Sequence, residues 1–158
     1  MCTPLRNEVE KVRKDFGLME KLKPVGLNEW RPIENKVYDT FCILTSHKSR
    51  PTWIWEALKV ENWGIRTERK PSILLDRLID HDKGLFLLLN ERHKFWVYEG
   101  TLRPIQTIIQ ECVEIDEVVI VNKKFDWILF INHHDDIIAG GPQMVVKLKA
   151  LQNELAAE

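Results

Sequence analysis

The stretch that decides the fold is GLFLLLN (84–90), KFWVY (94–98), EVVIVN (117–122), DWILFIN (126–132) and HHDDIIAGG (133–141). These short apolar runs are rich in Val, Ile, Phe and Trp and are bounded by turn residues, which is typical of β-strands. Between the second and third runs, apolar residues recur at helical spacing from Thr101 to Glu114. The stretch therefore predicts strands interrupted by one helix.

The polar residues between the runs predict how the strands connect. Glu91-Arg92-His93 predicts a hairpin between the first two strands, and Lys123-Lys124 predicts a tight antiparallel turn between the next two. Residues 118–121 and 128–131 are apolar at every position instead of alternating with polar ones. We therefore expect strands that are covered on both faces, with helices packed on the sheet.

Working outward, the flanking segments are predominantly helical in pattern. Thr3-Pro4 is typical of a helix start, and a stripe of apolar residues predicts a helix of about five turns that ends near Pro24. The stripe consists of Leu5, Val9, Val12, Phe16 and Met19. Residues 30–48 fit a helix or a strand, and we favour a helix. Residues 52–59 and 72–79 predict short helices, residues 62–71 a loop, and residues 142–155 a last helix.

Together these patterns predict an α+β fold in a single domain, residues 1–158. A mostly antiparallel sheet of about four to five strands (residues 85–139) is expected to pack with N-terminal, central and C-terminal helices.

The composition is that of a folded cytoplasmic protein. Of 158 residues, 44% are hydrophobic and 30% are charged, and the formal net charge of −1 gives no field that would attract nucleic acid or an anionic membrane. No apolar run approaches the ~20 residues that span a bilayer. Cys2, Cys42 and Cys112 form no CxxC pair, so we expect reduced thiols. We predict a cytoplasmic protein without membrane contact.

One segment concentrates side chains that could do chemistry, Asn132-His133-His134-Asp135-Asp136. On a strand, neighbouring side chains point to opposite faces, so His133 would pair with Asp135 and His134 with Asp136. A His and a carboxylate on one face could hold a divalent metal or act as an acid–base pair. The alternative, which we favour, is a polar strand end or hairpin tip with local turn hydrogen bonds.

Either kind of chemistry needs further groups. His93, His81 and Glu99 are candidates by residue type alone. Glu99 lies two residues before Thr101, where the predicted helix begins, and could equally act as a structural cap there or pair with Arg103.

A second candidate site is aromatic. Trp53, Trp55 and Trp63 lie near Arg66 and Arg69, a combination typical of protein-binding hot spots. Core packing of the tryptophans is the simpler interpretation. Stacking on single-stranded nucleic acid is a further alternative that nearby glutamates make unfavourable. The acidic residues Glu111, Glu114, Asp116 and Glu117 form either a surface for a basic partner or a solvated helix end.

The run FWVYEG (95–100), the helix after it and KFDWILFINHHD (124–135) resemble a family of small uncharacterised bacterial proteins, in which a YEG strand end and a DW…NHHD strand recur. More loosely, the order of helices, antiparallel meander and final helix is similar to the immunity proteins of the Smi1/Knr4 superfamily. This second resemblance implies a protein that neutralises a toxin by direct binding.

The sequence contains no complete catalytic set, so we predict a non-enzymatic cytoplasmic protein-binding module without a cofactor. An immunity or antitoxin-like protein that binds a cognate toxin is its most specific form. The alternative is a small hydrolase, metal-assisted or dependent on His/Asp acid–base chemistry. Its candidate residues are His133, His134, Asp135 and Asp136 with Glu99 or His93.

Overall fold

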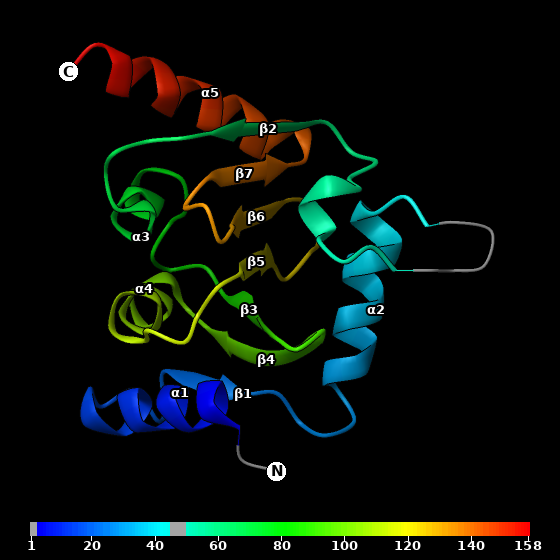
Figure 1. Ribbon diagram of the computed structural model, residues 1–158, viewed down its shortest axis with the longest axis vertical. Helices are drawn as coiled ribbons and strands as arrows, with labels where there is room; N and C mark the ends of the chain where they lie inside the picture. The colour runs from blue at the N-terminus through cyan, green and yellow to red at the C-terminus, as the bar shows by residue number, and fades with distance from the viewer. Residues whose placement is uncertain (1–2, 45–49) are drawn as a thin grey trace.

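The computed structural model describes residues 3–44 and 50–158 (Figure 1). Its centre is a seven-stranded antiparallel sheet in the order β1-β4-β3-β5-β6-β7-β2. The strands are β1 (Leu22–Pro24), β2 (Asn62–Ile65), β3 (Leu85–Glu91), β4 (Lys94–Gly100), β5 (Val118–Asn122), β6 (Ile128–Ile131) and β7 (Ile137–Gly140). The helices are α1 (Pro4–Asp15), α2 (Trp30–Phe41), α3 (Pro71–Leu74), α4 (Leu102–Glu111) and α5 (Pro142–Ala156), with the 3₁₀ turns η1 (Ile54–Glu56) and η2 (Leu75–Arg77).

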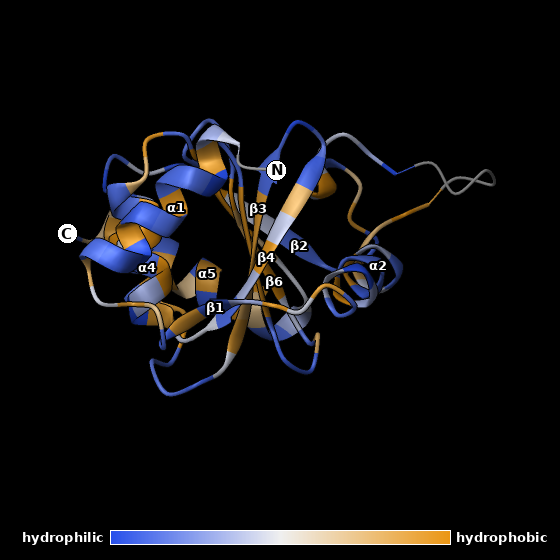
Figure 2. Ribbon diagram, turned by 90° about the horizontal axis from the view of Figure 1, so that it is seen from below, coloured by the Kyte–Doolittle hydropathy of each residue, from blue (hydrophilic) through white to orange (hydrophobic). Residues whose placement is uncertain are grey.

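The central strands are buried on both faces, as their continuous apolar runs predict. In β3, Leu85, Leu87 and Leu89 join the core on one face, while Phe86 and Leu88 join the core on the other. Helices α1, α4 and α5 cover the first face and α2 covers the second (Figure 2). This arrangement confirms an antiparallel sheet packed with N-terminal, central and C-terminal helices.

The sheet is wider than the predicted four to five strands because both of its edges come from outside residues 85–139. Strand β1 pairs with β4, and β2, in a segment predicted to be a loop, pairs with β7. Both edge strands are short and largely exposed, so they carry no apolar pattern. Backbone hydrogen bonding to the neighbouring strand defines them instead.

The hairpin between β3 and β4 is confirmed, and its turn residues Arg92 and His93 have φ of 52° and 66°. Positive φ at both central residues is the signature of a type I′ turn. A turn forms at Lys123-Lys124 as expected, where the Phe125 backbone N–H donates to the Asn122 carbonyl at 3.1 Å, but the connection is longer than a two-residue hairpin loop. The connection spans residues 123–127, because the Asn122 side chain accepts the backbone N–H of Asp126 at 2.8 Å and folds the loop around itself.

The helix predictions are right in place; the last helix is confirmed as α5, and the others are shorter than expected. Helix α1 begins after its Thr3 cap but ends at Asp15, and Gly17 with φ of 68° turns the chain, which leaves Phe16 and Met19 exposed. Helix α2 confirms the helical interpretation for residues 30–41, while residues 45–48 lie outside the described part. The segments at 52–59 and 72–79 form only single turns, η1 and α3 with η2.

In the described ranges, 3–44 and 50–158, no helix combines the length and the apolar character that a membrane span requires.

Candidate functional site

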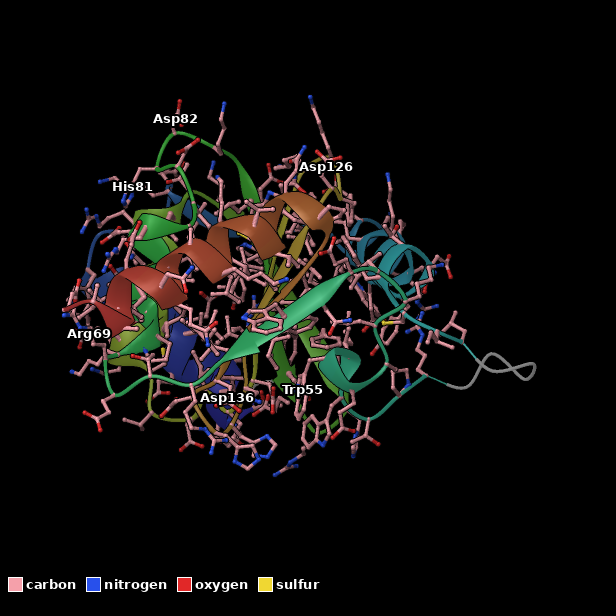
Figure 3. The ribbon with its side chains drawn as sticks, turned by 90° about the horizontal axis from the view of Figure 1, so that it is seen from above. Trp55, Arg69, His81, Asp82, Asp126 and Asp136 are labelled. Atoms are coloured by element: carbon pink, nitrogen blue, oxygen red, sulfur yellow. The ribbon has the colours of Figure 1, made fainter. Side chains whose placement is uncertain are left out.

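The two candidate segments, far apart in the sequence, meet at one end of the sheet. The ring of His133 lies 5.1 Å from that of Trp53 and 6.3 Å from that of Trp55, measured between centroids. The two indoles stack at 6.4 Å with an interplanar angle of 16°. His134 continues the group, 4.0 Å from His133. We call Trp53, Trp55, His133 and His134 the aromatic–histidine surface; Figure 3 shows Trp55 and Asp136 at this end of the molecule.

The histidines are carried by a hairpin tip. Strand β6 ends at Ile131 and β7 begins at Ile137. The buried Asn132 side chain accepts the backbone N–H groups of His134 and Asp136, each at 3.0 Å, and Asp135 adopts a φ of 61°. The segment is thus the hairpin tip with local turn hydrogen bonds that we favoured, and strand alternation does not apply to it. His133 contacts Glu117, whereas His134 lies near enough to Asp136 for its charge to help lower the pKa of Asp136.

Glu117, which sequence reasoning placed in a solvated acidic corner, is instead the buried centre of the site at 5% exposure. One carboxylate oxygen accepts the His133 backbone N–H at 3.1 Å and also contacts the His133 Nδ1. The other oxygen accepts the Trp55 indole N–H at 3.2 Å. We call this arrangement the Glu117 clamp, because one carboxylate fixes both Trp55 and His133.

No pattern in the sequence marks Glu117 as a clamp. The position follows from the register, which pairs Val118 with Ile131 and so brings the preceding Glu117 next to the start of the hairpin tip. The one feature in the sequence that could have drawn attention to Glu117 is that this carboxylate directly precedes the fully apolar strand β5.

A second contact ties the hairpin tip to the segment after β2. Arg66 donates to both carboxylate oxygens of Asp136, at 2.7 and 3.1 Å. These hydrogen bonds lower the pKa of Asp136 and outweigh the opposing effect of its partial burial; Asn132 lowers it further. Asp136 is thus engaged within the protein.

A cavity of about 330 Å³ opens beside the aromatic–histidine surface. Its lining residues include Trp53, Glu117, Arg92, His93, Glu114 and Asp116. His93 therefore belongs to the same end of the sheet as the histidine pair. Glu114 and Asp116 are exposed and outnumber the exposed Arg92, so this rim is acidic on balance.

Other predicted site residues lie elsewhere. Glu99 is near the opposite end of β4, where it pairs with Lys123. His81 pairs with Asp76 at 2.6 Å. Trp63 packs on α5, on the opposite face of the sheet from α2, where its indole N–H donates to Gln152 at 3.0 Å. Arg69 pairs with Glu158 near the end of that helix. The aromatic and arginine candidates therefore do not form one surface.

The chemistry available at the site is limited to acid–base groups. Because a carboxylate oxygen only accepts, this contact is a hydrogen bond when His133 carries its hydrogen on Nδ1, the tautomer that leaves Nε2 as the basic nitrogen. Within residues 3–44 and 50–158, no hydroxyl or thiol is hydrogen-bonded to His133. Across the same described residues, no three His, Cys, Asp or Glu side chains are grouped so that they could hold a metal ion.

The described cysteines are unsuited to nucleophilic roles. Burial raises the pKa of Cys42 to about 11 and that of Cys112 to about 12. Both thiols are buried and unpaired by disulfides, so they serve as apolar core side chains.

Fold and site together define an α+β protein with an open antiparallel sheet and an aromatic–histidine surface at one of its ends. Residues 1–152 match the model of a family of unknown function, DUF6756, and the chain belongs to that family. This confirms the expectation of an uncharacterised family. No curated protein and no solved structure matches the chain.

Proposed function

We propose that this protein is a non-enzymatic binding module that recognises another protein through the aromatic–histidine surface. The observation that carries the proposal is the Glu117 clamp, which fixes Trp55 and His133 beside Trp53. Aromatic side chains dominate protein-binding hot spots, and holding them in place before binding reduces the entropy lost on association.

The charge around this surface favours a basic partner. Exposed carboxylates flank it: Glu56 follows Trp55, Asp135 follows His134, and Glu114 and Asp116 line the adjoining cavity. The neighbouring Arg66 is neutralised by Asp136. An acidic rim around an aromatic centre suits a partner that presents Lys or Arg at its margin, where complementary charge raises the association rate.

An immunity or antitoxin-like protein of the cytoplasm, which neutralises a cognate toxin by direct binding, is the specific form of this proposal. Its support is the looser resemblance made from the sequence, in which the order of helices, antiparallel meander and final helix is compared with that of Smi1/Knr4-type immunity proteins. Direct binding by such a protein needs a preformed surface and no catalytic group, which fits the clamped side chains.

The test is binding to the products of neighbouring genes, each purified and titrated into this protein by isothermal calorimetry. The proposal predicts that one of these products forms a stoichiometric complex that weakens as salt rises, because the acidic rim contributes. Failure of every neighbouring product to bind contradicts the immunity form of the proposal.

The Glu117–His133 pair also favours a second candidate, a small hydrolase in which His133 acts as a general base through Nε2. Hydrolysis assays on protein purified without chelator or His-tag test this candidate. It predicts activity that is lost in His133→Ala and kept in His81→Ala, a matched histidine away from the site. Equal activity in both variants contradicts it.

A further inference from the structure

A cavity at the opposite end of the sheet has a character unlike that of the aromatic–histidine surface. It measures about 340 Å³, within the range of roughly 300–1,000 Å³ that small-molecule pockets occupy. It lies between the loop before β3, the β5–β6 loop and the first turns of α5. In Figure 3, Asp82 and Asp126 mark the first two of these loops, across the molecule from Trp55 and Asp136.

Lysines from three separate elements meet around this cavity: Lys83 before β3, Lys124 in the β5–β6 loop and Lys147 on α5. In the part of the chain that the structure describes, none of them forms an ion pair. A fourth lysine, Lys123, is neutralised by Glu99. The same cavity is lined by two carboxylates, Asp80 and Asp126, so the three lysines leave it with a net excess of one positive charge. The Lys147 amine also donates to the Leu78 carbonyl at 3.4 Å, which holds it at the cavity.

The cavity also offers groups suited to the rest of a small organic ligand. Trp127, half-buried, lines it and presents an aromatic side chain. Asp80 and Asp126 line it as well, and the Asp126 carboxylate is held by the Asn122 side-chain amide at 3.2 Å. Amines, an indole and carboxylates are the groups that bind phosphate, a planar ring and sugar hydroxyls respectively.

Gly141, which directly precedes α5, determines how closely the start of this helix approaches the β5–β6 loop. This residue has a φ of +103°, and a Cβ placed on it would lie 2.7 Å from the Asp126 carbonyl oxygen and 3.2 Å from the Trp127 Cα. Only glycine permits this approach, which brings the start of α5 against the β5–β6 loop. The contact positions Lys147 and Trp127 on the same cavity.

We propose that this cavity binds a nucleotide, with the phosphate on Lys83, Lys124 and Lys147 and the base against Trp127. Lysine binds phosphate as a point charge, and base–aromatic stacking tolerates any base. Asp80 and Asp126 then accept hydrogen bonds from ribose hydroxyls. The site lies at the other end of the sheet from the aromatic–histidine surface and does not depend on the proposed binding function.

The test is calorimetric titration of the full chain with AMP, adenosine and inorganic phosphate. AMP is expected to bind best, because only AMP engages both the lysines and Trp127. Lys147→Gln is expected to weaken AMP binding about tenfold, the effect of losing one charged contact. Lys149→Gln is the matched control: it lies on the same helix, with its amine 4.7 Å from the Trp63 ring, and AMP affinity should not change.

NMR of the indole N–H groups provides a second readout, with the Trp127 signal identified by its loss in Trp127→Phe. AMP should shift the Trp127 signal and leave that of Trp63 unmoved. Equal affinities for AMP and inorganic phosphate would overturn the assignment to a nucleotide. Absence of AMP binding, or equal weakening by Lys147→Gln and Lys149→Gln, would overturn the site itself.

Discussion

The Glu117 carboxylate accepts the backbone N–H of His133 and contacts its imidazole Nδ1, although the two residues belong to different strand ends. Its second oxygen accepts the indole N–H of Trp55, so a single buried side chain orients two exposed segments. The consequence is a surface whose geometry is fixed by contacts within the protein itself.

Replacing Glu117 by Gln removes this orientation, because the amide turns a donor toward either Trp55 or His133. We expect a loss of about 2 kcal/mol in the free energy of unfolding, typical of hydrogen bonds to a buried charged group. Urea unfolding measures it. The matched control is Asp116→Asn, an exposed neighbour, for which a change below about 0.5 kcal/mol is expected. Equal losses in the free energy of unfolding for the two variants would contradict a structural role for the Glu117 clamp.

Glu91 attaches the start of α1 to the end of β3. Its carboxylate accepts hydrogen bonds from the Leu5 N–H at 3.0 Å, the Trp96 indole at 2.9 Å and the Thr3 hydroxyl. Burial opposes ionisation of Glu91, but these hydrogen bonds together outweigh it and lower its pKa. Glu91→Gln should therefore reduce the free energy of unfolding at pH 7 by about 1–2 kcal/mol.

The pH dependence of this difference follows from the lowered pKa. A carboxyl whose pKa is lower in the folded state stabilises the protein above its ordinary pKa of about 4.3 and loses that contribution as the pH falls through the folded value. The gap between wild type and Glu91→Gln should narrow below about pH 4. Glu99→Gln, on the neighbouring strand, serves as the control, and a gap that widens in acid would contradict the assignment.

A position can require glycine because its φ is positive or because a Cβ would clash with neighbouring atoms. Gly17 shows the first reason alone, and Gly141 shows both. Both have positive φ, but a Cβ at Gly17 meets no atom within 4 Å, whereas one at Gly141 would lie 2.7 Å from a backbone oxygen. Gly17→Ala should destabilise by about 1 kcal/mol, the strain of a left-handed residue alone. Gly141→Ala should lose clearly more than that, in thermal or urea unfolding. Equal losses would show that the close approach at Gly141 relaxes freely.

Tyr98 is fully buried, and its hydroxyl makes no hydrogen bond to any residue that the structure describes. Because an unsatisfied buried hydroxyl opposes folding, Tyr98→Phe should leave the free energy of unfolding unchanged or raise it by up to about 1 kcal/mol. Tyr98→Ala, which removes the ring as well, should lose about 3 kcal/mol or more. A clear loss in Tyr98→Phe would mean that the hydroxyl is satisfied in solution.

The centre of the fold is predictable from sequence because its strands carry their own signal. Consecutive residues of a strand point to opposite faces, so the apolar neighbours Leu87 and Leu88 indicate a strand that is covered on both faces. The edges give no such signal. Strands β1 and β2 exist because their backbones pair with β4 and β7, and their exposed side chains do not encode that pairing.

The site is predictable in its parts but not in its assembly. Trp53 and His133 each stand out by residue type, yet their contact depends on how η1 packs against the sheet end. The role of Glu117 depends on the register of Val118 with Ile131. Both depend on how segments that are far apart in the sequence pack and pair in the folded protein. The periodicity of a single segment carries no information about this.

The central claim is that the aromatic–histidine surface binds a protein partner, and the most direct measurement is the affinity of a neighbouring-gene product for three forms of this protein. Trp53→Ala should weaken binding about thirtyfold, the effect of removing a hot-spot aromatic worth about 2 kcal/mol. Trp63→Ala, on the opposite face of the sheet, should leave the wild-type affinity unchanged. A partner that binds all three forms equally well would contradict the account.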